Sequence, residues 1–153
     1  MYANMTREQV IDDAVEKFDA GFNCAEAVFA AGAAYAGISS PLIPRAATAL
    51  GAGVGRMQNL CGIISGGVMA IGLVYGRDDQ NGDRFKPYEL ARRYAAAVER
   101  IRSSTMCSEI TGVDMADPDQ NAAFRQPGGV HYTVCGPLMR RALDELFAIL
   151  DGE

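Results

Sequence analysis

The chain has 153 residues, 49% of them hydrophobic, with no tryptophan and a net charge of −5. This length is enough for one domain with a sizeable core, and we predict a single helical domain over residues 1–153. The negative charge excludes nucleic acid as the expected partner, because no excess of basic side chains could neutralise phosphates. The first residues lack the basic start and apolar stretch of a secretory signal, so we expect a cytoplasmic protein with reduced thiols.

Capping signals open the first two predicted helices. Thr6 and Gln9 have the spacing of a capping box, and an apolar stripe at helical spacing then runs until Gly21. Asn23 begins a second such signal, which opens an alanine-rich helix ending near Tyr35. The chain therefore starts with two helices joined by a short connection.

An apolar helix is predicted near the middle of the chain. A helix over Pro44–Leu50 is followed by a glycine-rich turn at residues 51–57, and Asn59 is a candidate N-cap for a helix over Leu60–Tyr75. The segment from Leu60 to Gly76 has no charged residue, but it is at the short end of the roughly 17–25 residues that span a bilayer. We therefore expect a central helix buried by its neighbours and no stable membrane insertion.

Helices are also predicted in the second half of the chain. An inward-facing stripe favours a helix over Pro87–Ser103, and a short turn holds Cys107. Several glycine, proline and aspartate residues favour a loop over residues 112–130, before a final helix from Cys135 to Leu150. Alternating β-branched runs are absent. The predicted fold is an all-α, single-domain bundle of five to six helices around a central glycine-containing apolar helix.

Four cysteines, widely spaced in the sequence, each fall where a helix is predicted to begin: Cys24, Cys61, Cys107 and Cys135. A helix start carries free N–H groups and a partial positive charge, which stabilise a thiolate. We therefore expect lowered thiol pKa values at a shared site assembled by folding. The long gaps between the cysteines exclude a Cys-x-x-Cys redox motif and paired zinc knuckles.

Other residues could support the cysteines. Arg56 would favour a thiolate at Cys61, and Asn59 would cap the helix beginning there. His131, the single histidine, is a candidate proton shuttle or a fourth metal ligand, although an ordinary loop histidine is the simpler interpretation. The glycines that follow Cys61, Gly62 and Gly66, indicate close helix packing.

The cysteine pattern resembles a known family. A lone cysteine, the segment Cys61-Gly62-Ile63-Ile64-Ser65-Gly66 and two further lone cysteines have the order found in the C_GCAxxG_C_C family of redox-active proteins. The resemblance covers about residues 6 to 140, and Ile63 departs from it by replacing an alanine. It implies thiol-based redox chemistry without naming a substrate.

Three functions follow as hypotheses. The first is a thiol–disulfide oxidoreductase with Cys61 as the attacking thiol, Cys24 as its resolving partner, and Cys107 and Cys135 as a second pair. The second is an electron-transfer module in which the four cysteines hold an iron–sulfur cluster or another metal. The third is a structural or transporter-accessory protein with inert cysteines. The cofactor, a protein or small-molecule redox partner, and a homodimeric state remain open.

Overall fold

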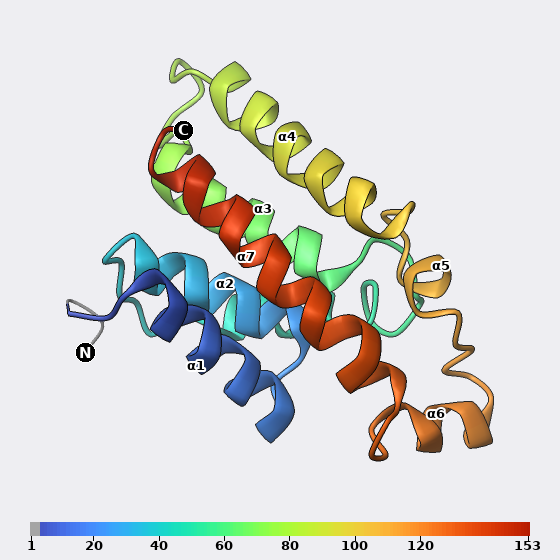
Figure 1. The fold of residues 1–153 in the computed structure, drawn as a ribbon. Coiled ribbons are helices and arrows are strands. Elements are labelled where there is room, and N and C mark those ends of the chain that lie inside the picture. Colours follow the sequence, from blue (N-terminus) through green and yellow to red (C-terminus); the bar gives the residue numbers. More distant parts are fainter. Residues whose placement is uncertain (1–3) are drawn as a thin grey trace.

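The computed structural model describes residues 4–153, which form an all-α fold (Figure 1). Five long helices make the bundle: α1 (Arg7–Ala20), α2 (Cys24–Tyr35), α3 (Gly62–Tyr75), α4 (Phe85–Arg102) and α7 (Gly136–Leu150). Short elements complete the described part of the chain: α5 (Cys107–Thr111), α6 (Pro118–Phe124), a 3-10 helix η1 (Arg45–Leu50) and a π-helical turn η2 (His131–Cys135). The predicted all-α bundle is confirmed, with short helices added to the five long ones.

Both predicted capping boxes are present. The Thr6 hydroxyl accepts from the Gln9 backbone N–H at 3.2 Å, and the Gln9 side chain accepts from the Thr6 N–H at 2.8 Å. Asn23 and Glu26 make the same reciprocal pair at 2.9 and 2.8 Å. Gly21 ends α1 at a φ of 125°, a conformation that favours glycine. This short connection makes Cys24 the first residue of α2.

Glycines let α3 approach its neighbours closely, as predicted. A Cβ added to Gly66 would lie 2.5 Å from the backbone oxygen of Ala25, so α2 and α3 meet almost backbone to backbone. A Cβ on Gly67 would overlap the ring of Tyr94 in α4. The buried Tyr94 hydroxyl donates to the Ile63 carbonyl at 2.8 Å, which fixes α4 against the first turn of α3.

The core is shared between α3 and α7. Helix α3 packs on α2, α4 and α7, whereas α7 packs on each of the other four long helices. The last turn of α3 reaches solvent, with Leu73 and Val74 exposed by 40% and 37%. The predicted central position therefore holds for the first part of α3. Within residues 4–153, no helix is both long enough and apolar enough to cross a membrane.

The structure shifts some predicted helix boundaries. Cys61, and not Asn59, occupies the N-cap position of α3, and its side chain makes no capping hydrogen bond. The region 112–130, predicted as a loop, contains α6. The Asp117 carboxylate starts α6 by accepting from the second and third N–H groups at 3.0 Å each, and Pro118 occupies its first turn.

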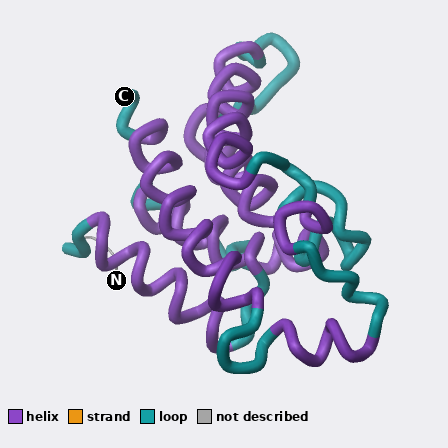
Figure 2. Tube along the Cα trace, turned by 45° about the vertical axis from the view of Figure 1, so that its right-hand side comes forward, coloured by secondary structure: helices purple, strands orange, loops and turns teal. Residues whose placement is uncertain are grey.

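The helix starts gather at one end of the bundle. Helices α2, α3 and α7 all begin on the side where α5 and α6 lie (Figure 1). Figure 2 shows the long loop segments on either side of α5 and α6 at the same end. Residues far apart in the sequence, including the four cysteines, are therefore brought to one region.

Candidate functional site

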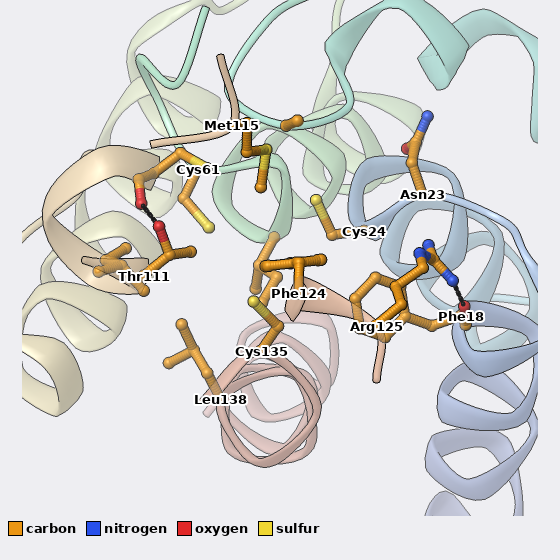
Figure 3. Close-up of a pocket in the computed structure, with 14 residues that line it drawn as sticks. Phe18, Asn23, Cys24, Cys61, Thr111, Met115, Phe124, Arg125, Cys135 and Leu138 are labelled. Carbon is orange, nitrogen blue, oxygen red and sulfur yellow. Dashed lines mark hydrogen bonds between the residues drawn. The ribbon is translucent and has the colours of Figure 1, made fainter. Parts of the chain in front are cut away.

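All four cysteines line one cavity of about 80 Å³. Cys24 begins α2, Cys61 precedes α3, Cys107 begins α5, and Cys135 ends η2 where α7 starts. Figure 3 shows Cys24, Cys61 and Cys135 around this space, with Phe124 and Arg125 on one side. A space of this size exceeds the roughly 10–15 Å³ that one water molecule needs, so a reacting group of several atoms fits between the cysteines.

Backbone pairing holds Cys61 and Cys107 side by side. The segments that precede α3 and α5 run antiparallel and form an isolated bridge. The Cys61 N–H donates to the Thr105 carbonyl at 2.9 Å, and the Cys107 N–H donates to the Asn59 carbonyl at 2.7 Å. Asn59 thus contributes to the site through its backbone, where the sequence predicted a capping side chain.

Cys24 lies against the first turn of α3. A Cβ on Gly62 would overlap the Cys24 sulfur, so the glycine after Cys61 makes room for this sulfur. The backbone N–H groups of Ala52, Ala25 and Gly62 lie near the Cys24 sulfur and favour its thiolate, which opposes the effect of burial on its pKa. The Ala25 and Gly62 donors belong to the first turns of two helices, where N–H groups have no partner within the helix.

The glycine-rich segment has an unusual backbone. Residues 52–56 all have positive φ, including the non-glycine residues Ala52 (51°), Val54 (65°) and Arg56 (64°). A β-branched valine in this region is rare and costs about 1–3 kcal/mol, which the surrounding structure must offset. The sequence predicted a turn here. The left-handed run brings the Ala52 N–H near the Cys24 sulfur, and the glycines at 53 and 55 were its only sequence signal.

Gln58, which also has a positive φ of 56°, was missed by the sequence analysis. Its side-chain oxygen accepts from the Met115 N–H at 2.9 Å, and its nitrogen donates to the Val113 carbonyl at 2.6 Å. The same side chain lies near Cys107 and lowers the pKa of its thiol, against the larger effect of burial. Gln58 therefore ties the loop after α5 to the cysteine cavity.

The structure overturns the prediction of lowered thiol pKa values. Burial raises the pKa of all four cysteines, to about 11 for Cys107 and about 12 for Cys135. Repulsion from the neighbouring thiolates, Cys24 above all, adds to the increase at the other three. Loss of solvent outweighs the helix starts because the sulfur atoms face one another in an apolar space.

Exposure separates Cys24 from the other cysteines. Cys61 and Cys107 are each 6% exposed and Cys135 is 9% exposed, whereas Cys24 is half-buried. Cys24 also has the largest number of backbone N–H donors at its sulfur. Cys24 is therefore the least buried of the four residues, although its sulfur itself is enclosed.

The two arginines near the site differ from the sequence interpretation. Arg56 is exposed and does not line the cavity; it donates to the Asn121 side chain at 2.8 Å and to the Met115 carbonyl at 3.4 Å. Arg125, which the sequence analysis did not single out, does line the cavity and lies 5.7 Å from the Phe18 ring centroid. Arg125 also favours the thiolate of Cys135.

His131 lies behind the cavity wall. It is 0% exposed, stacks on Phe18 at 3.9 Å between ring centroids, and its Nε2 lies 2.8 Å from Asp19 Oδ1. His131 does not line the cavity, whereas Phe18 does. Its contact with the cavity is therefore indirect, through the Phe18 ring, and its Nδ1 has no hydrogen-bond partner among residues 4–153.

This buried histidine predicts a pH-dependent stability. Burial lowers the pKa of His131 below its ordinary value, against the opposing effect of Asp19. The unfolded chain therefore binds a proton more readily, so the free energy of unfolding should fall as pH decreases through about 6.5. Urea unfolding at pH 7.5 and pH 5.5 measures this, with His131→Gln as the non-titrating control. An equal pH effect in both proteins would contradict the prediction.

The described residues offer no ready site for a single metal ion. Within residues 4–153, no three histidine, cysteine, aspartate or glutamate side chains are close enough together to hold one. The cysteines instead surround a space larger than an ion. This arrangement suits disulfide exchange among neighbouring sulfur atoms, or a polynuclear cluster held by all four.

Comparison with known proteins gives one family. The model of the family described as "Putative redox-active protein (C_GCAxxG_C_C)" matches residues 22–149, which include all four cysteines. Neither the curated proteins nor the solved structures gave a match. The matched segment covers most of the chain, and the chain belongs to the C_GCAxxG_C_C family, whose description fits a general redox role.

Proposed function

We propose that this protein is a thiol–disulfide redox protein in which Cys24 and Cys61 alternate between two thiols and one disulfide. The observation that carries the proposal is the convergence of four cysteines from four separate elements on one cavity. Three of these residues are buried and Cys24 is half-buried, so Cys24 is the residue of the four that lies nearest to solvent. The family match to a redox-active description supports the same chemistry.

Cys24 is the proposed attacking thiol, which reverses the roles favoured by the sequence. The Cys24 residue is less buried than Cys61, and three backbone N–H groups near its sulfur favour its thiolate. The thiolate attacks a substrate disulfide, forms a mixed disulfide and releases one substrate thiolate. Cys61 then attacks the Cys24 sulfur, releases the second substrate thiolate and completes the protein disulfide. Two protein thiols lose two electrons and two protons, and the substrate disulfide gains both.

Cys61 is the proposed resolving thiol because the Cys24 sulfur lies against Gly62, the residue that follows Cys61. Cys24 is also the strongest electrostatic neighbour of Cys61 among the other cysteines. Cys107 and Cys135 form the second proposed pair. A charged Cys24 makes both ionise less readily, and a charged Cys107 does the same to Cys135, so transfer between the pairs would proceed one thiolate at a time.

Counting thiols and mapping disulfides tests this function. The reduced protein is expected to show four thiols, and mild oxidation with glutathione disulfide should remove two, with a Cys24–Cys61 bridge in the peptide mass spectrum. Cys135→Ser is the matched control, because it leaves the proposed first pair intact. Thiols that react only after denaturation would overturn the proposal and support inert core cysteines.

An iron–sulfur cluster is the second candidate, favoured by the arrangement of all four cysteines around a single cavity. Cysteine thiolates hold such clusters, and N–H groups directed at the sulfur atoms tune their potential, as the donors at Cys24 would. Anaerobic reconstitution with iron and sulfide should then give stoichiometric iron and visible absorbance. Both signals should be lost in Cys135→Ser, whereas disulfide exchange between Cys24 and Cys61 should survive that change.

A further inference from the structure

A surface cleft of about 360 Å³ adjoins the cysteine cavity. The two spaces have five lining residues in common: Asn23, Ala52, Met115, Phe124 and Arg125. Cys24, the most accessible cysteine, begins α2 directly after Asn23 in this shared wall. The cleft thus adjoins the cysteine cavity across these five residues, while Cys24 itself lines the inner cavity.

The charge of this cleft opposes that of the protein. Arg56 and Arg125 line it and, among the residues that the structure describes, no carboxylate does, whereas the whole chain carries a net charge of −5. Arg56 donates to an amide and a carbonyl, and Arg125 donates to the Phe18 carbonyl at 3.5 Å. Neither guanidinium has a carboxylate partner within residues 4–153. Two uncompensated cations in one concave surface indicate an anionic ligand.

The adjacent acidic side chain is already engaged. Glu26, the third residue of α2, accepts from the Thr48 hydroxyl at 2.6 Å and from the Asn23 backbone N–H at 2.8 Å. These bonds hold the Glu26 carboxylate to the helix cap and to a residue of the cleft wall. It therefore does not neutralise Arg56 or Arg125 through an ion pair.

We infer that the cleft binds a small disulfide that carries carboxylate groups, with its carboxylates on Arg56 and Arg125 and its sulfur atoms toward Cys24. The inference rests on the proposed function and adds the substrate class. The cleft volume is within the range of about 300–1,000 Å³ typical of small-molecule sites. Arginine forks bind carboxylates through paired hydrogen bonds, which would orient the disulfide.

The electrons and protons of this reaction balance with the disulfide as the only substrate. The Cys24 thiolate forms a bond to one substrate sulfur as the substrate S–S bond breaks, and the departing carboxylate-bearing thiolate takes up a proton. Attack by the second cysteine releases the other half as a thiol. The disulfide is reduced by two electrons, the two cysteines are oxidised by two electrons, and no other reactant is needed.

Two disulfides of opposite charge test the inference. The oxidation rate of the reduced full-length protein would be measured with glutathione disulfide, which is anionic, and with cystamine, which is cationic. Arg56→Gln and Arg125→Gln should each lower the ratio of the glutathione disulfide rate to the cystamine rate by about tenfold, the effect of losing one charge-assisted contact. Arg92→Gln is the matched control, because it removes the same charge from the exposed face of α4.

The outcomes separate this inference from the proposed function. Arg56→Lys and Arg125→Lys should recover part of the rate ratio, which a purely structural role of either arginine would not predict. An unchanged ratio in both glutamine variants, with normal exchange, would overturn the anionic-substrate inference and leave the redox function standing. No reaction of wild-type protein with either disulfide would overturn the proposed function itself.

Discussion

Cys24→Ser is expected to lower the rate of disulfide exchange by at least about tenfold, because it removes the thiolate that attacks the substrate disulfide and a serine hydroxyl does not replace it. The three remaining thiols are buried, and burial raises their pKa values, to about 11 for Cys107. Serine preserves the size of the side chain at the start of α2 but removes the nucleophile. The measurement is the oxidation rate of the reduced protein by glutathione disulfide, followed through loss of titratable thiols.

The control for this experiment is Cys107→Ser, which removes a buried thiol outside the proposed first pair. Its rate should stay close to that of the wild type. Because burial raises the pKa of Cys24, the wild-type rate should also climb steadily from about pH 6 to pH 8 without a plateau. A plateau near neutrality, or equal rates in the two serine variants, would remove Cys24 from the attacking role.

Gly66→Ala is expected to destabilise the protein by about 1–3 kcal/mol, the usual cost of overpacking a core. The added methyl group would lie 2.5 Å from the Ala25 backbone oxygen and 3.1 Å from its Cα, and neither atom can move without shifting α2. This cost exceeds the gain of about 1 kcal/mol or less that alanine brings to a helix interior. Urea unfolding followed by circular dichroism gives the change in unfolding free energy.

Gly72→Ala is the matched control on the same helix. A Cβ at Gly72 would meet no atom of the described residues within 4 Å, and the residue is exposed. The substitution should therefore stabilise the protein by about 0.5–1 kcal/mol through helix propensity alone. If both alanine variants shifted stability in the same direction, the close approach of α2 and α3 at Gly66 would be disproved.

The sequence by itself determined the elements that depend on neighbouring residues. The capping boxes at Thr6 and Asn23 and the glycine stop at Gly21 depend on contacts within a few residues, so their positions could be predicted correctly. The apolar stripes then required an all-α fold, because each must be buried against another helix. The cysteine and glycine pattern carried the family resemblance, which the family match confirms.

Only the tertiary structure decided the chemistry of the site. Local sequence predicted easily ionised thiols at helix starts, but burial among one another raises their pKa values. Local sequence also predicted roles for Arg56 and His131, but these roles depend on which side chains the two residues contact. In the structure Arg56 contacts Asn121 and His131 contacts Asp19. The arginine that lines the cavity is Arg125. Solvent exposure and contacts between distant segments arise only when the chain is folded, and both dominate the electrostatics of a buried sulfur cluster.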